Sequence, residues 1–169
     1  MNNIYFTGFM GTGKTTVSKK LCELTGAKWI DTDEEIEKEE GRKISDIFAA
    51  DGEEYFRKAE TAILKKIAAS KDRLVVSCGG GLVLKDENIN IMKESGSVVF
   101  LSALPETIFE HVKYSHNRPV LEGNMNVEFI RELLEKRLPF YEKAADFRVE
   151  CDGKSVKEIT AEVRGNYFT

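Results

Sequence analysis

The sequence predicts an α/β fold of three layers, in which helices cover both faces of a five-stranded parallel sheet. Short β-rich runs alternate with longer amphipathic segments, which favours βα units and parallel pairing. A glycine-rich stretch separates the first apolar run from the first amphipathic segment. The length of 169 residues suits one core and is short of two ordinary domains. We therefore expect one domain over residues 1–169, with ligands at the carboxyl ends of its strands.

The strands are predicted where β-branched and aromatic residues cluster in short runs. These runs cover residues 3–7, 28–31, 74–77, 97–101 and 147–150. Apolar residues at intervals of three and four predict helices over residues 15–24, 53–69, 127–143 and 155–167. In the first of these helices Val17, Leu21 and Leu24 share one face, so the helix has an apolar side to bury.

Residues 8–15, GFMGTGKT, fit the phosphate-binding pattern GxxxxGK[ST] between a predicted strand and a predicted helix. Glycines clear the way for backbone N–H groups to approach a polyphosphate, and the helix points its positive end at the anion. We expect an exposed Lys14 to bridge the β- and γ-phosphates as a catalytic residue, and the Thr15 hydroxyl to bind Mg²⁺. The nucleotide-binding residues expected here are Gly11, Thr12, Gly13, Lys14, Thr15 and Thr16. The plainer alternative is a glycine-rich turn without a ligand.

The formal net charge of -4 and the pI near 5.4 argue against a nucleic-acid binder that works by bulk electrostatics. Three cysteines, Cys22, Cys78 and Cys151, lack metal-site spacing and are odd in number, so we expect free buried thiols in a reducing compartment, by default the cytoplasm. No apolar stretch approaches membrane-spanning length and no basic segment precedes the first apolar run, which predicts neither an anchor nor a signal peptide. Without an extended apolar patch we expect a monomer.

Two connections are long for a compact domain. The first joins the second predicted strand to the third over residues 31–73 and is expected to hold two or three helices. The segment of about 111–126 is polar and contains Arg118-Pro119, which favours a mobile lid that keeps water from the transferred phosphate. An ordinary flexible surface loop is the alternative.

Several further motifs follow the predicted elements in order: Asp31-Thr32-Asp33, FRKAE at 56–60, Gly79-Gly80-Gly81, Arg118-Pro119-Val120-Leu121, and Arg137 with Tyr141. Together with GFMGTGKTT, they make the chain resemble the shikimate kinase family over essentially its full length. The resemblance implies a P-loop kinase fold of the nucleoside-monophosphate-kinase type and transfer of the γ-phosphate of ATP to the 3-hydroxyl of shikimate, for chorismate and aromatic amino acid synthesis. It implies Mg²⁺ as cofactor. It also implies a core of 1–32, 71–110 and 127–169, an acceptor-binding insertion of about 33–62 and the lid.

The resemblance places Arg57 and Arg137 on the shikimate carboxylate and Asp33 on the hydroxyls beside the reacting oxygen. Guanidinium groups suit a carboxylate because they offer paired donors, and a carboxylate suits hydroxyls because it accepts. By the same resemblance, the backbone of Gly79, Gly80 and Gly81 would lie against the ring of shikimate. Taken alone, Arg57 is more often a surface ion pair with Glu60, three residues later. Glu60, three residues after Arg57, is expected to orient that guanidinium as a supporting partner.

Asp31 and Asp33 are expected on the same side of an extended segment, because side chains alternate with period two. The resemblance implies that Asp31 faces Mg²⁺ together with Thr15, directly or through water. It also implies that Asp33 faces the acceptor hydroxyl as positioning group or base. The pair could also cap the next helix, and the two roles are compatible.

Arg118 is the expected catalytic arginine and nucleotide contact of the lid, whereas His111, Lys113 and His116 are left open. Lys154 follows the last strand, where the family holds adenine, but Val156 replaces the usual proline. Competing interpretations are a gluconate or nucleoside-monophosphate kinase, or a non-catalytic nucleotide-binding module, which should have lost Lys14, Asp33 or Arg118.

Overall fold

A computed structural model of the protein describes residues 2–114, 123 and 125–167. It contains a parallel five-stranded sheet with the order β2-β3-β1-β4-β5. The strands are β1 (Asn3–Thr7), β2 (Lys28–Asp31), β3 (Leu74–Ser77), β4 (Gly96–Ser102) and β5 (Phe147–Glu150). The five predicted strands and their parallel pairing are confirmed, and β4 is one residue longer at each end than predicted.

Seven α-helices occur in the described ranges: α1 (Lys14–Thr25), α2 (Thr32–Glu40), α3 (Ile44–Ala68), α4 (Asp86–Ser95), α5 (Pro105–Val112), α6 (Val127–Ala144) and α7 (Val156–Tyr167). A short 3₁₀ helix, η1 (Leu82–Leu84), follows β3. Gly52, with a φ of 84°, interrupts α3, and the prediction covered only the part after it. The short helices α4 and α5 were not predicted. None of the helices in the described part is long and apolar enough to span a membrane.

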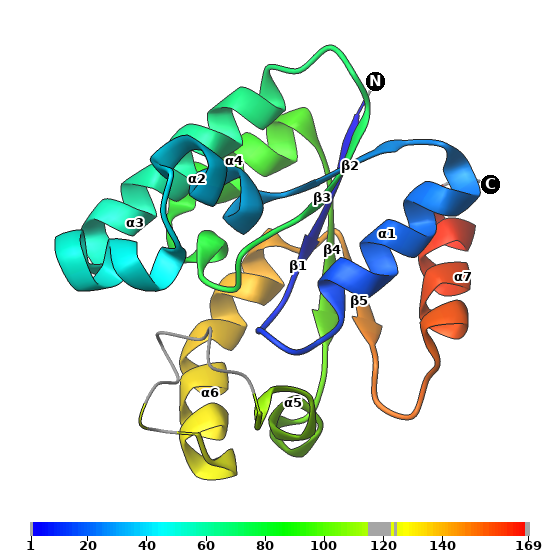
Figure 1. The fold of residues 1–169 in the computed structure, drawn as a ribbon. Coiled ribbons are helices and arrows are strands. Elements are labelled where there is room, and N and C mark those ends of the chain that lie inside the picture. Colours follow the sequence, from blue (N-terminus) through cyan, green and yellow to red (C-terminus); the bar gives the residue numbers. More distant parts are fainter. Residues whose placement is uncertain (1, 115–122, 124, 168–169) are drawn as a thin grey trace.

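The sheet lies between two helical layers (Figure 1). Along β1 the side chains alternate: Ile4 and Phe6 pack with α1 and α7, whereas Tyr5 packs with the core that includes α3, α4 and α6. Both faces of the strand are therefore buried, which accounts for its continuous apolar sequence. The three-layer α/β/α prediction is confirmed.

The strand order determines where the loops meet. In a parallel sheet all carboxyl ends share one edge. β3 lies between β1 and β2, so the loops that follow these three strands are neighbours. Gly8 begins the loop after β1, with a φ of 145°, and a Cβ atom there would collide with the Leu101 carbonyl oxygen of β4. This close approach is open only to glycine.

The segment predicted as a lid begins inside a helix, because α5 continues to Val112. The motif Arg118-Pro119-Val120-Leu121 and His116 lie outside the described residues.

Candidate active site

A cavity of about 630 Å³ opens at the carboxyl edge of the sheet. Its walls come from the P-loop (residues 8–15), the ends of β2 and β3, helix α5 and the segment after β5. The predicted site residues that line it are Gly11, Thr12, Gly13, Lys14, Thr15, Thr16, Asp31, Asp33, Gly79, Gly80 and Lys154. The structure therefore brings most of the predicted nucleotide, metal and acceptor residues to one cavity.

The Lys14 side chain is buried rather than exposed, with an exposed fraction of 9%. Its ammonium donates to the Gly8 and Phe9 carbonyl oxygens at 2.8 and 2.9 Å. The expectation of an exposed lysine was wrong, because the carbonyls of a tightly turned loop need donors and this side chain supplies them. α1 begins at Lys14, so its first N–H groups and positive dipole end face the same loop.

Asp31 and Asp33 share the cavity for a reason other than the predicted one. Asp31 ends β2 and caps α2, where its Oδ1 accepts from the N–H groups of Asp33 and Glu34 at 2.9 and 3.1 Å. Asp33 is therefore helical, so the argument from an extended segment was wrong. The capping alternative is confirmed for Asp31, and it occupies one of the two carboxylate oxygens.

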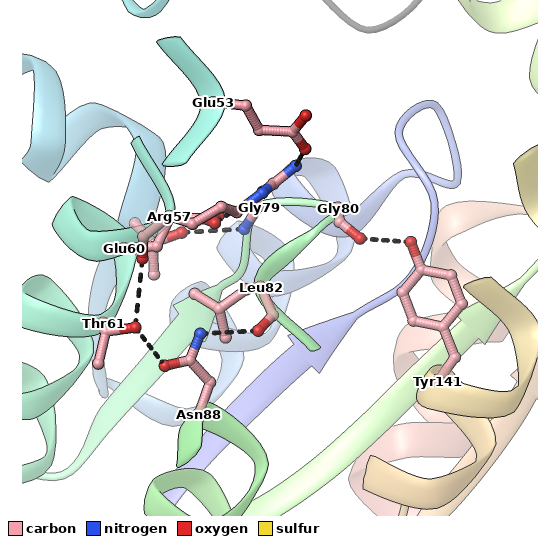
Figure 2. Close-up of polar contacts among 10 residues, drawn as sticks. Glu53, Arg57, Glu60, Thr61, Gly79, Gly80, Leu82, Asn88 and Tyr141 are labelled. Atoms are coloured by element: carbon pink, nitrogen blue, oxygen red, sulfur yellow. Dashed lines mark hydrogen bonds and ion pairs between the residues drawn. The ribbon is translucent and has the colours of Figure 1, made fainter. Parts of the chain in front are cut away.

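Arg57 lies against the glycine run (Gly79, Gly80 and Gly81) that follows β3 (Figure 2). A Cβ atom on Gly81 would lie 2.6 Å from Arg57 Cζ and nearer still to a terminal nitrogen, so only glycine admits this guanidinium. Arg57 donates to Glu60 Oε1 at 2.7 Å and to Glu53 Oε1 at 3.1 Å. The ion pair with Glu60 exists, but it is buried rather than on the surface, since Glu60 is 0% exposed.

Burial and the charge of the partner both shift the pKa values of Arg57 and Glu60. Burial lowers the pKa of Arg57, whereas the Glu60 and Glu53 carboxylates raise it, and the net change is a rise. Burial raises the pKa of Glu60 against the opposing effect of Arg57 and Arg137. The guanidinium of Arg57 therefore stays charged beside the glycine run.

Arg137 reaches the glycine run from α6 and is 4% exposed. A Cβ atom on Gly80 would lie 3.5 Å from its Nη1, and this buried nitrogen has no hydrogen-bond partner among the described residues. A buried donor without an acceptor costs free energy, which an anionic ligand would recover. Gly81, Arg57 and Arg137 do not line the cavity itself but adjoin it through Gly80.

The glycine run is held by polar contacts that sequence reasoning missed. The Tyr141 hydroxyl donates to the Gly80 carbonyl, and burial raises the pKa of Tyr141 to about 12, so the donor proton is retained (Figure 2). The Gly79 N–H donates to Thr32 Oγ1 at 2.9 Å. Asn88 of α4 donates to the Leu82 carbonyl at 2.8 Å (Figure 2). Three separate elements thus determine the position of one short backbone segment.

The opposite end of the cavity lies between α5 and the segment after β5. Lys154 lines it and forms an ion pair with Glu162 at 3.0 Å. His111 also lines it, and its Nδ1 lies 2.6 Å from the Gly11 carbonyl oxygen. Lys113 instead pairs with Glu110 and is not part of the walls. Of the basic residues left open by the sequence, His111 is the described one that contacts the P-loop.

The three cysteines are free thiols, as predicted, but Cys22 is only partly buried, so the expectation of burial was wrong for it. Cys78 and Cys151 line the cavity and are buried. Burial raises the pKa of both thiols, that of Cys151 to about 11. Both therefore stay protonated and weakly nucleophilic near neutral pH.

Comparison with known proteins identifies a consistent set of relatives. A family model described as shikimate kinase matches residues 10–166. A shikimate kinase of Persephonella marina is 48% identical over 165 residues, 98% of each chain, and one of Thermodesulfovibrio yellowstonii is 43% identical over 167 residues, 99% of this chain and 95% of its own. Among solved structures, the shikimate kinase from Acinetobacter baumannii in complex with shikimate has a TM-score of 0.93 at 32% identity, covering 100% of this chain and 96% of the other.

The two carboxylates on Arg57 offer a matched test of the buried pair. Glu60→Gln should lower the free energy of unfolding by about 3–5 kcal/mol, because it leaves the buried guanidinium without its main counter-ion. Glu53 is 61% exposed, so Glu53→Gln should cost less than about 1 kcal/mol. Urea unfolding at neutral pH measures both. Equal losses of unfolding free energy in the two variants would show that the buried Arg57–Glu60 pair stabilises the fold no more than the exposed Arg57–Glu53 pair.

Proposed function

The chain belongs to the shikimate kinase family, and from that premise we propose that it transfers the γ-phosphate of ATP to the 3-hydroxyl of shikimate. The products are shikimate 3-phosphate and ADP. The observation that carries this proposal is the meeting of a P-loop with two buried arginines at one glycine run. The P-loop suits a nucleotide polyphosphate, and the two arginines suit a small carboxylate that carries hydroxyls.

The P-loop residues Gly11, Gly13 and Thr16 line the nucleotide side of the proposed site. We propose that Lys14 exchanges its contacts with the Gly8 and Phe9 carbonyls for contacts with the β- and γ-phosphates when ATP binds. Such an exchange brings the ammonium charge to the phosphates, where negative charge is redistributed during the transfer. Lys154 is the proposed contact at the other end of the cavity.

Thr15 and Asp31 are the proposed ligands of Mg²⁺. They line the same cavity, and a hydroxyl with a carboxylate oxygen is a donor set that suits this ion, which takes its other ligands from water and phosphates. Since one Asp31 oxygen already caps α2, a contact through water is in keeping with the site. When bound, Mg²⁺ neutralises charge on the phosphates.

On the acceptor side, Arg57 and Arg137 would bind the carboxylate and the glycine run would lie against the ring. Asp33 is close to the same run, since a Cβ atom on Gly79 would lie 2.7 Å from its Oδ1. Asp33 would orient the reacting hydroxyl and take its proton as the phosphoryl group is transferred. Phosphoryl transfer asks mainly for positioning and charge neutralisation, which these residues supply.

Arg118 remains the proposed catalytic arginine of a lid at about 111–126, and about 33–62 the proposed acceptor-binding insertion in a single domain. The insertion corresponds largely to α2 and to α3 up to residue 62. Helix α2 directly follows β2 and packs on α3 (Figure 1). We further infer a cytoplasmic monomer. Its thiols are unpaired, and its large exposed apolar residues in the described part are scattered.

An acceptor panel tests the proposed function. With Mg²⁺ and ATP, the purified chain should phosphorylate shikimate and leave gluconate and AMP essentially untouched. AMP has no carboxylate for the two arginines, and gluconate, although it is a hydroxylated carboxylate, has no ring to lie against the glycine run. Coupled detection of ADP measures the rates. Turnover of gluconate or AMP as fast as that of shikimate would contradict the proposal, and absence of any turnover would favour a non-catalytic module.

The carboxylate clamp is tested by Arg137→Ala. Its shikimate binding should weaken by about 2–5 kcal/mol, because a desolvated ion pair loses one partner, while ADP binding stays unchanged. Arg137→Lys should recover only part of the loss, since an ammonium cannot make the paired contact. Isothermal titration with shikimate and with ADP measures both.

Two variants serve as controls for the clamp. Arg131→Ala removes a partly exposed arginine from the same helix, one that pairs with Glu128 at 2.8 Å, and should bind shikimate like the parent. Asp33→Asn should still bind shikimate but lose most of its turnover, since the amide cannot accept the hydroxyl proton. If Arg137→Ala and Arg57→Ala both bound shikimate like the parent, the clamp would lie elsewhere.

A further inference from the structure

Helix α5 is hydrogen-bonded at both ends to loops that line the nucleotide cavity. At its first turn, the Thr107 hydroxyl donates to Asp152 Oδ1 at 2.7 Å, and the Leu104 N–H donates to the same oxygen at 3.1 Å. Asp152 belongs to the segment after β5. At the last turn, His111 meets the Gly11 carbonyl of the P-loop. The helix thus connects the two ends of the cavity.

The contact of His111 has a defined direction. A carbonyl oxygen only accepts, so Nδ1 must carry the proton and donate to it, at 2.6 Å. The helix also packs closely on the loop, because a Cβ atom on Gly11 would lie 2.7 Å from Val112 Cγ1. Gly11 has a φ of 80°, a second reason for glycine at this position. The last turn of α5 is therefore seated directly on the phosphate loop.

One peptide unit joins this contact to the phosphate site. The carbonyl of Gly11 and the N–H of Thr12 belong to the same peptide group, which is trans. The Thr12 N–H therefore points away from His111, and Thr12 lines the cavity. Hydrogen bonds at the two ends of a peptide group polarise it and strengthen each other. A phosphate held by the Thr12 N–H would strengthen the bond from His111, and the reverse holds equally.

We propose that His111 is a positioning residue for the nucleotide, which orients the Gly11–Thr12 peptide for the phosphates and holds α5 on the P-loop more firmly when they bind. The proposal rests on the proposed function, since it takes the cavity to be the site of ATP. Its effect runs through Nδ1 and the backbone rather than through the charge of the ring. This mechanism differs from two others: direct contact of the imidazole with the nucleotide, and electrostatic attraction of the nucleotide by a basic residue.

Substitutions at position 111 separate these mechanisms. The side-chain nitrogen of Asn is attached at the same position as Nδ1, whereas that of Gln corresponds to Nε2. His111→Ala and His111→Gln should therefore raise the Kd for Mg·ADP by about 3- to 10-fold, the range of a lost neutral hydrogen bond. His111→Asn should stay within about twofold of the parent, and the Kd for shikimate alone should not change in any of the three.

The matched control is Lys113→Ala, which removes a charge two residues away that pairs with Glu110 and does not line the cavity. It should bind Mg·ADP like the parent. Because His111 is exposed, the variants should fold, and circular dichroism and thermal melts check this.

Each outcome of the titrations decides the proposal. An alanine variant with the affinity of the parent would overturn it, as would an asparagine variant as weak as alanine, or a loss in Lys113→Ala that matches His111→Ala. A parent chain that binds Mg·ADP but phosphorylates another acceptor would contradict only the proposed function. A parent that binds no Mg·ADP would contradict both.

Discussion

The guanidinium of Arg57 packs on the backbone of Gly81 in space that any Cβ atom would fill, and the arrangement of the acceptor side depends on this contact. It brings a charged group next to the end of β3 while Glu60 compensates the charge from within the same helix. Arg137 approaches the neighbouring Gly80 from α6 with an unpaired nitrogen. Buried charges of this kind stabilise a fold poorly, so their presence is better explained by a ligand that they are arranged to receive.

The parallel sheet accounts for why two separate chemistries meet. β1 carries the P-loop, β3 carries the glycine run, and β2 ends at the capping residue Asp31, and the strand order makes all three neighbours. Tyr141 and Thr32 then hold the glycine run, and Asn88 holds Leu82 directly after it, each from a different element. A site held from several directions keeps its geometry before ligand arrives, which lowers the free-energy cost of ordering it during binding. The long connection that holds α2 and α3 supplies the acceptor side without disturbing this frame (Figure 1).

Much of the fold was predictable because its signals are local. The strands, α1, α6 and α7 follow from apolar periodicity, and the P-loop follows from residue types at fixed spacing. The predictions that were wrong concerned residues whose surroundings are determined by tertiary structure. Lys14 was expected to be exposed, but the carbonyls that bury it are set by the turn of the loop. Asp33 was expected in an extended segment, but α2 begins directly after the strand, once Asp31 caps it. The contact of His111 with Gly11 joins positions 100 residues apart, and no sequence pattern marks it.

Replacement of Gly81 by alanine tests the dependence of the acceptor side on this close contact most directly. The added methyl group must displace the Arg57 guanidinium, so the shikimate Kd should rise by about tenfold or more while the Mg·ADP Kd stays at the parent value. Gly165→Ala, where a Cβ atom would meet nothing within 4 Å, controls for the substitution itself. Calorimetric titration of the two variants and the parent supplies the comparison. A Gly81→Ala chain that binds shikimate as tightly as the parent, with an unchanged melting temperature, would contradict the account.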